Sequence, residues 1–182
     1  MKATVNGRTI ELVKGDITKE TTMAIANAAN ALLAGGGGVD GAIHQAAGPA
    51  VMAELKKKYP GGTRPGTAVI TGGGNLAAKW ILHAVGPKYS GASGDPALLL
   101  GAYQSCLLLC VKHGISSIAF PSISTGAYGY PVEAAAPVAL GTVAQHLQKA
   151  KNPSVVRFVL FDDETFDAYH HAMHHLGFDH GH

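Results

Sequence analysis

The chain has 182 residues, of which 47% are hydrophobic and 14% are charged, and its formal net charge is +2. This composition excludes an intrinsically disordered chain, and so small a net charge gives no electrostatic reason to expect nucleic-acid binding. No apolar run reaches the roughly 18 residues of a transmembrane helix, and the N-terminus lacks the apolar segment of a signal peptide. We therefore expect one domain over residues 1–182, located in the cytoplasm.

Strand and helix patterns alternate along the chain. Residues 3–14 predict two strands joined at Asn6-Gly7, a dipeptide typical of tight hairpin turns. Apolar runs predict further strands at residues 23–26, 67–71, 80–85, 117–120 and 155–161. Helical patterns occupy residues 39–47, 49–59, 96–113, 132–148 and 164–176. The alternation predicts an α/β fold, with a largely parallel or mixed sheet and helices on both of its faces.

The stretch from Ala26 to His44 has the most unusual composition in the chain. Its four consecutive glycines, residues 35–38, bury no side chain, so they fit a place where the main chain approaches a ligand closely. Asn27 and Asn30 precede them, and Asp40 follows in the first turn of a predicted helix. Together these residues predict a ligand site. The alternatives are asparagines that satisfy buried loop amides and a carboxylate favoured by the helix dipole.

A second glycine-containing segment, residues 124–129, lies between a predicted buried strand and a helix. Small residues, backbone N–H groups and a helix N-terminus are the components of an anion site. This segment matches neither a P-loop nor the G-x-G-x-x-G fingerprint. Ligands of α/β folds bind at the carboxyl ends of strands. The two glycine-containing segments are predicted to lie there, together with Gly15-Asp16 and Phe161-Asp162. Two such loops at one edge would suit a pyrophosphate between two sugars.

Other residues with ionisable or reactive side chains have simpler structural interpretations. Asp16 alone fits an Asx turn that caps the next segment. Cys106 and Cys110 lie four residues apart in an apolar helical pattern and are expected to be buried thiols. The basic patch at residues 56–58 is expected to be a solvated helix face, with a phosphate or nucleic-acid contact as the alternative.

The histidines and one loop tyrosine are also open to two interpretations. His83, in a predicted strand, is expected to be a core or edge residue, and His44 a buried and satisfied histidine, with support of the ligand site as the alternative. Tyr128 is expected to cover a ligand or simply to pack. The C-terminal histidines are expected to form a solvated face that binds metal only adventitiously; they are His170, His171, His174, His175, His180 and His182.

These segments, in this order, resemble the macrodomain family, and within it the MacroD-type branch. The motifs that carry the resemblance are Gly15-Asp16-Ile17-Thr18, Asn27-Ala28-Ala29-Asn30, Gly35-Gly36-Gly37-Gly38-Val39-Asp40, Ile43-His44, Ala47-Gly48-Pro49, Ile81-Leu82-His83, Val85-Gly86-Pro87, Phe120 to Gly126, Tyr128-Gly129-Tyr130-Pro131 and Phe161-Asp162. The resemblance covers nearly all of residues 9–176, and residues 177–182 are expected to be a frayed tail. Two departures, Ala77 in place of a usual proline and Ala84 in place of a common threonine, lie outside the predicted site.

The resemblance implies a three-layer α/β/α macrodomain fold with a mixed central sheet, and an ADP-ribose site. In such a site Asp16 would recognise adenine beside a main-chain contact of Ile17, and Phe161 would pack by the adenine and its ribose. The pyrophosphate would be held by Ser124, Thr125, Gly126, Ala127 and Tyr128. The distal ribose would be surrounded by Asn27, Asn30 and Asp40, with Gly37, Gly38 and Val39 as further ligand contacts. The pair credited with catalysis is Asn30 and Asp40.

The activity implied by the resemblance is hydrolysis of ADP-ribosyl esters. The substrates would be proteins that carry mono-ADP-ribose on acidic residues, and O-acetyl-ADP-ribose, with no metal ion or cofactor and no membrane or nucleic-acid partner. Asp40 would either orient or deprotonate a water, or act by positioning while the substrate's own phosphate assists. The alternative function is a non-catalytic ADP-ribose reader. The presence of Asn30 and Asp40 beside four glycines favours the enzyme.

Overall fold

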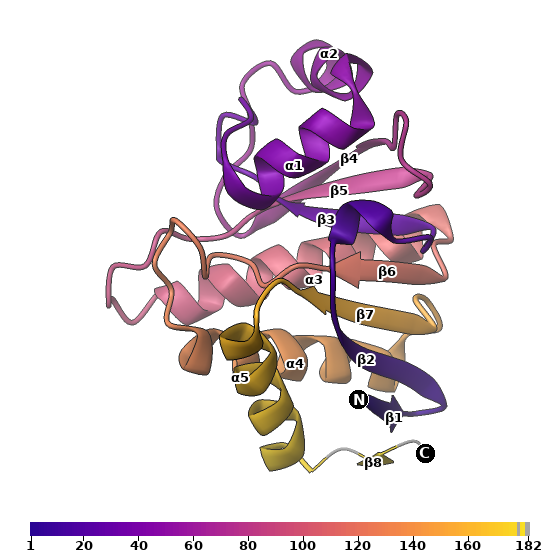
Figure 1. Ribbon diagram of the computed structural model, residues 1–182, viewed down its shortest axis with the longest axis vertical. Helices are drawn as coiled ribbons and strands as arrows, with labels where there is room; N and C mark the ends of the chain where they lie inside the picture. Colours follow the sequence, from indigo (N-terminus) through magenta and orange to yellow (C-terminus); the bar gives the residue numbers. More distant parts are fainter. Residues whose placement is uncertain (178, 181–182) are drawn as a thin grey trace.

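A single mixed sheet runs through the molecule, with the strand order β4-β5-β3-β6-β7-β2-β1-β8 (Figure 1). The computed structural model describes residues 1–177 and 179–180. The strands in this part of the chain are β1 (Lys2–Val5), β2 (Arg8–Lys14), β3 (Ala24–Ala28), β4 (Thr67–Gly72), β5 (Trp80–Val85), β6 (Ser117–Phe120), β7 (Val155–Leu160) and β8 (Asp179–His180). The five neighbours β2, β7, β6, β3 and β5 are parallel, while β4, β1 and β8 are added antiparallel at the two ends.

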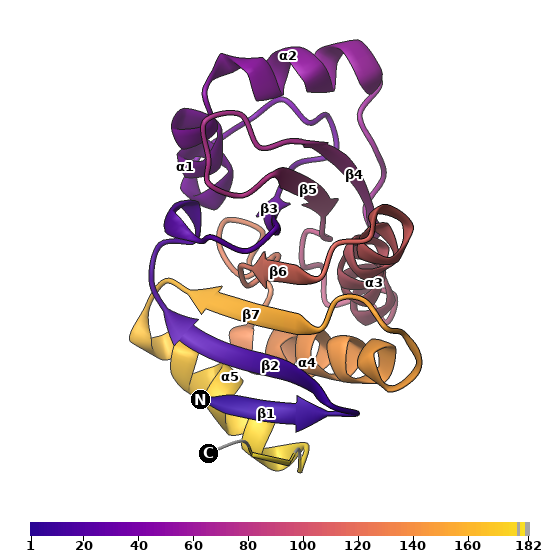
Figure 2. The ribbon, with the colours of Figure 1, turned by 90° about the vertical axis from the view of Figure 1, so that its right-hand side faces the viewer.

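The helices cover both faces of this sheet, as predicted. They are α1 (Gly38–Ala47), α2 (Pro49–Lys58), α3 (Asp95–His113), α4 (Val132–Lys149) and α5 (Asp163–His175). Figure 2 shows α1 on the opposite side of β3 from α3. Within the described residues, no helix has the length and apolar character needed to cross a lipid bilayer.

Two apolar clusters, one on each face, hold the layers together. The larger cluster packs α3, α4 and α5 against the sheet and includes Tyr103, Phe120 and Phe158. The smaller cluster packs α1 and α2 against the other face and includes Ile43 and Leu55. Burial of these side chains removes apolar surface from water, which is the main stabilising contribution to such a fold. The three-layer α/β/α arrangement is therefore confirmed.

Local sequence features explain where the first elements turn and end. Asn6 and Gly7 both have positive φ, 51° and 76°, and join β1 to β2 as the hairpin dipeptide predicts.

Cys106 and Cys110 are free and buried in α3, and burial raises the pKa of both thiols, that of Cys110 to about 12. The interpretation as buried thiols is confirmed.

Three details differ from the sequence-based expectation. The strand predicted at residues 155–161 ends at Leu160, which leaves Phe161 in a loop. The loop after β2 contains a short 3-10 helix, Ile17–Lys19. Part of the segment expected to be a frayed tail is paired, because Asp179–His180 forms β8 beside β1. His182 lies outside the described residues, as does the side chain of His180.

Candidate active site

The carboxyl ends of four parallel strands meet at one edge of the sheet. β2, β7, β6 and β3 are consecutive neighbours in the strand order, so the segments that follow them lie at the same edge (Figure 1). Those segments hold Asp16, the stretch from Ala29 to Asp40, the loop at residues 124–130 and Phe161, while Asn27 lies near the carboxyl end of β3 itself. The sequence-based prediction that they converge is confirmed.

Asp16 and Phe161 lie beside each other at this edge. The residue before Asp16, Gly15, donates its N–H to the carbonyl of Leu160, the residue before Phe161, over 3.1 Å. Phe161 is 87% exposed, which is unusual for so large an apolar ring on a folded protein. The exposed ring and the neighbouring carboxylate are suited to one flat, polar-edged ligand group.

The carboxylate of Asp16 uses only one of its two oxygens within the protein. Oδ1 accepts from the backbone N–H of Thr18 over 2.9 Å and from its hydroxyl over 2.7 Å. These bonds, first that of the hydroxyl and then that of the backbone, lower the pKa of Asp16. The alternative interpretation of Asp16 as a capping residue is therefore correct for the oxygen Oδ1. No protein donor to Oδ2 is found in the described residues, so Asp16 can cap and bind a ligand together.

Asn27 is fully buried and links Asp40 to a histidine that the sequence did not place in the site. Its side-chain Nδ2 donates to Oδ1 of Asp40 over 2.8 Å and lies 3.2 Å from Nδ1 of His83. Nδ1 of His83 must therefore accept, so Nε2 carries the proton and donates to the hydroxyl of Thr71 over 2.8 Å. Burial, and next the nearby His44, lower the pKa of His83 to about 3, which keeps this ring neutral.

One acceptor in this buried network has no partner. The orientation of Asn27 is set by its two acceptors, because the reversed amide would place oxygen against oxygen at Asp40. Its Oδ1 is then buried without a hydrogen-bond partner among the described residues. Leaving such an atom unpaired costs about 1–3 kcal/mol. A hydroxyl donor from a ligand would remove this cost.

His44 contacts Asp40 but is only partly satisfied. Its Nε2 lies 3.3 Å from Oδ1 of Asp40, one helical turn earlier on α1. Its ring stacks on that of His83 with centroids 5.9 Å apart. Nδ1 of His44 is buried without a partner in the described part of the chain, so the expectation of a satisfied histidine is only half correct. The contact with Asp40 favours the supporting role that the sequence left open.

Asn30 closes the loop that carries the glycines. Its Nδ2 donates to the carbonyl of Gly35 over 2.8 Å, and its Oδ1 accepts from the N–H of Ala34 over 3.1 Å. The interpretation of Asn30 as a residue that satisfies loop backbone is thus realised in the structure. Nδ2 retains a second hydrogen, so binding of a ligand hydroxyl is compatible with this arrangement.

Gly36 lies between the two residues credited with catalysis. A Cβ atom at this position would stand 3.6 Å from Oδ2 of Asp40 and 3.9 Å from Nδ2 of Asn30. The carbonyl of Gly36 in turn packs on α1, where a Cβ at Gly41 would approach it to 2.4 Å. Main chain without side chains therefore separates Asn30 from Asp40. Gly36 was not among the predicted ligand contacts, which included Gly37, Gly38 and Val39.

The loop at residues 124–130 has the geometry of an anion site. Ser124 has a φ of 68°, and its Oγ is buried with no hydrogen-bond partner in the described residues. A Cβ on Gly86 would approach that oxygen to 2.1 Å, so glycine is required beside it. In the described structure the backbone N–H groups of Thr125, Gly126 and Ala127 donate to no protein acceptor. Unpaired donors ahead of the α4 N-terminus favour a negatively charged ligand.

Two tyrosines that the sequence did not single out form hydrogen bonds with the residues that lead into this loop. The hydroxyl of Tyr103, on α3, accepts from the N–H of Ile123 over 2.9 Å. The hydroxyl of Tyr169, on α5, donates to Oγ of Ser122 over 2.8 Å. Burial raises the pKa of both phenols, so they remain protonated. At the rim, the ring of Tyr128 is half-buried, with Nζ of Lys88 5.6 Å from its centroid.

The described residues hold no group of three or more His, Cys, Asp or Glu side chains arranged to bind a metal ion. His171 and His175 stack on the exposed face of α5, with ring centroids 6.2 Å apart.

The fold and the site together define a three-layer α/β protein with a polar ligand site at the carboxyl edge of its sheet. The family model described as Macro domain matches residues 26–139. The chain belongs to the Macro domain family.

Named relatives and solved structures agree with this assignment. The O-acetyl-ADP-ribose deacetylase 1 of Pantoea vagans is 49% identical over 163 residues, which cover 88% of this chain and 95% of that protein. The Oceanobacillus iheyensis macrodomain with ADP has a TM-score of 0.91 and 43% identity, covering 97% of this chain and 95% of the other. The Trypanosoma brucei macrodomain in complex with ADP-ribose has a TM-score of 0.85 and 37% identity, covering 90% of this chain and 68% of the other.

Proposed function

We propose that this protein binds ADP-ribose and hydrolyses esters formed on its distal ribose. The substrates are O-acetyl-ADP-ribose and proteins that carry mono-ADP-ribose on acidic side chains. The observation that carries the proposal is the arrangement of Asp40: Asn27 anchors its Oδ1, and its Oδ2 lies 3.6 Å from the position that a Cβ at Gly36 would take. The name of the Pantoea vagans relative supports the deacetylase activity, and removal of mono-ADP-ribose from proteins extends the same ester chemistry.

The ligand would lie along the carboxyl edge of the sheet. Its adenine would pack on Phe161 and donate its amino group to Oδ2 of Asp16. Its pyrophosphate would accept from the unpaired N–H groups at residues 125–127 and from Oγ of Ser124. Its distal ribose would then reach Asn27, whose buried Oδ1 accepts from a ribose hydroxyl. Each of these protein atoms has no other partner among the described residues.

The reaction is the addition of water to the acyl carbon, followed by cleavage of the bond between that carbon and the ribose oxygen. The products are a carboxylic acid and the free ribose hydroxyl, which takes up a proton. Asp40, with its orientation fixed through Oδ1, would orient the attacking water through Oδ2 or accept its proton. Positioning of the ribose by Asp40, with assistance from the substrate's own phosphate, remains the second mechanism that this geometry accommodates.

A non-catalytic reader is the second candidate, and one observation favours it. Both polar atoms of the Asn30 side chain already hold the backbone of residues 34–35, which is a sufficient structural reason for an asparagine there. A reader would also need Asp16, Phe161 and the pyrophosphate loop, but would gain nothing from an anchored carboxylate beside the distal ribose.

Turnover separates the two functions. The purified protein is incubated with O-acetyl-ADP-ribose and with a peptide that carries mono-ADP-ribose on a glutamate, and free ADP-ribose is measured. The proposal expects release from both substrates, and the Asp16→Asn variant provides a control with weakened binding. Saturable binding of ADP-ribose without release from either substrate would assign the protein as a reader.

A further inference from the structure

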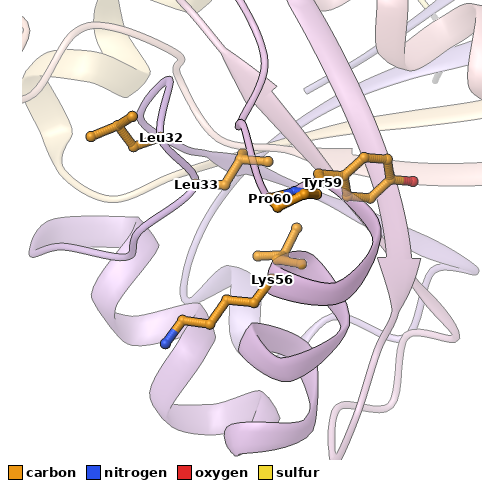
Figure 3. Close-up of a pocket in the computed structure, with 6 residues that line it drawn as sticks. Leu32, Leu33, Lys56, Tyr59 and Pro60 are labelled. Carbon is orange, nitrogen blue, oxygen red and sulfur yellow. The ribbon is translucent and has the colours of Figure 1, made fainter.

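A small hollow lies next to the loop that Asn30 closes, outside the ADP-ribose site proposed above. Its volume is about 160 Å³, and it opens between that loop and α2 (Figure 3). The residues that line it are Leu32, Leu33, Leu55, Lys56, Tyr59 and Pro60. Five of these six are apolar or aromatic, and one carries a positive charge.

The loop side of the hollow is fixed rather than loosely placed. Leu33 donates its N–H to the carbonyl of Asn30 over 2.9 Å, and Thr63 donates to the carbonyl of Ala31 over 2.8 Å. A Cβ on Gly62 would approach the Ala31 carbonyl to 2.0 Å, so the segment after α2 packs directly on this loop. Leu32 is nevertheless 76% exposed. A leucine held outward by a braced loop presents apolar surface that a ligand can cover.

The helix side of the hollow supplies an uncompensated charge. Of the three lysines at the end of α2, Lys58 pairs with Glu54 over 2.8 Å. Lys56 and Lys57 form no ion pair within the described residues, and Lys56 lines the hollow. An apolar floor with one unpaired cation at its rim is complementary to a segment that carries an apolar side chain and a carboxylate.

The position of the hollow relates it to the reaction. The acylated distal ribose would lie between Asn30 and Asp40, and Leu32 follows Asn30 by two residues. A protein substrate is joined to ADP-ribose through that acyl group, so its polypeptide must leave the site close to the loop at residues 31–35. O-acetyl-ADP-ribose carries only a methyl group beyond the carbonyl carbon and would end before the hollow.

We infer that this hollow binds the polypeptide of the ADP-ribosylated substrate beside the modified residue, with Leu32 covering an apolar side chain and Lys56 pairing with a neighbouring carboxylate. This inference rests on the proposed function, because it assumes that an ester on the distal ribose is hydrolysed. It assigns the protein a preference for modified glutamates or aspartates in acidic segments that also contain an apolar residue.

Three substrates test the inference. Two are peptides with one mono-ADP-ribosyl glutamate each, flanked by Asp and Leu in the first and by Ser and Gly in the second; the third is O-acetyl-ADP-ribose. The wild type is expected to favour the first peptide over the second by about tenfold in kcat/KM. In the Leu32→Ser/Lys56→Glu variant that preference should fall to below about twofold through a higher KM, while kcat/KM for O-acetyl-ADP-ribose stays within about twofold of wild type.

Matched controls carry the same chemical changes away from the site. Lys149→Glu at the end of α4 reverses one charge, and Leu108→Ser on α3, where Leu108 is 55% exposed, removes one exposed leucine. Both should retain the wild-type preference, and thermal melts should show that all variants fold.

The outcomes separate the inference from the function on which it rests. A wild type that hydrolyses O-acetyl-ADP-ribose but does not distinguish the peptides overturns the inference alone. So does a double variant that loses activity on all three substrates in parallel, since that result marks a structural role of the loop. Absence of turnover on every substrate overturns the proposed function, and with it the inference that the hollow binds the substrate polypeptide.

Discussion

Asn27 and Asp40 are thirteen residues apart in the chain, yet the amide Nδ2 of Asn27 lies 2.8 Å from Oδ1 of Asp40. The second hydrogen of the same nitrogen points to Nδ1 of His83 over 3.2 Å. Because both hydrogens are used, rotation of the amide would break two buried bonds at once. Asp40 therefore enters any reaction with its orientation already set, which lowers the entropy that must be lost in the transition state.

Replacement of both Asn30 and Asp40 by alanine should lower turnover by at least ~10²-fold, as is typical when positioned acid–base groups are lost. Affinity for ADP-ribose, measured by calorimetry, should fall far less because the adenine and pyrophosphate contacts remain. The two changes should be non-additive, since groups that act together fail together. Turnover of the double variant within threefold of wild type would contradict the catalytic assignment.

Asp40→Asn is the companion variant for this test. It keeps the size of the side chain and an acceptor oxygen for Asn27, so the buried network and the melting temperature should persist. Loss of turnover in Asp40→Asn then reports the missing charge of the carboxylate and not a disturbed helix.

Asp16→Asn should weaken ADP-ribose binding by on the order of 1.5–3 kcal/mol, the usual contribution of a charge-assisted hydrogen bond. Asparagine can keep the capping bonds to Thr18 through Oδ1, but it places an NH₂ group where Asp16 has Oδ2. Two donors would then face each other at the adenine amino group. Asp163→Asn, outside the predicted site, is the charge-matched control, and equal affinity in both variants would remove Asp16 from the adenine site.

Gly126→Val should abolish detectable ADP-ribose binding with little change in the thermal melt. A Cβ at Gly126 meets no protein atom within 4 Å, so the ligand-free fold has room for the side chain. The loop backbone would no longer be able to approach a pyrophosphate closely. A folded variant that still binds ADP-ribose would show that this loop does not hold the phosphates.

The stability of the protein should fall as the pH drops from 7 to 5, and His83 should account for part of this loss. Its folded pKa of about 3 lies below the unfolded value of 6.5, so the unfolded chain takes up a proton first. The stabilisation from the neutral ring is complete above pH 6.5 and is lost as the pH falls toward 3, with about 2 kcal/mol lost by pH 5.

Denaturant unfolding at pH 7, 6 and 5 measures this contribution when wild type is compared with His83→Gln. Glutamine does not titrate and the two proteins differ at no other residue, so the difference in their free energies of unfolding should shrink with falling pH. Parallel stability curves would show that His83 is not buried in its neutral form.

The sequence was sufficient to predict the fold and the convergence of the unusual segments at one edge of the sheet, because hydrophobic periodicity and turn residues are local signals. Asn6-Gly7 marked the hairpin, Gly48-Pro49 separated α1 from α2, and the unusual segments were placed at strand ends. The parallel order of β2, β7, β6 and β3 then brought those segments to one edge.

The contacts inside the site depended on information that is not local. His83 joins the site because β5 pairs with β3 in a register that sets His83 opposite Asn27. Sequence periodicity predicts each strand but not which residues face each other across two strands. The bracing of Ser122 and Ile123 by Tyr169 and Tyr103 has the same origin, since those tyrosines belong to helices remote in sequence. The two-residue strand β8 is too short to leave a pattern.

The close approach of Gly41 to the Gly36 carbonyl divides the glycines of this region into two kinds for protein engineering. A methyl group at Gly41 would stand 2.4 Å from that carbonyl oxygen and would push the loop off the helix that carries Asp40. A methyl group at Gly37 would meet no protein atom within 4 Å. A library intended to alter substrate choice while preserving the fold should therefore randomise Gly37 and keep Gly41 constant.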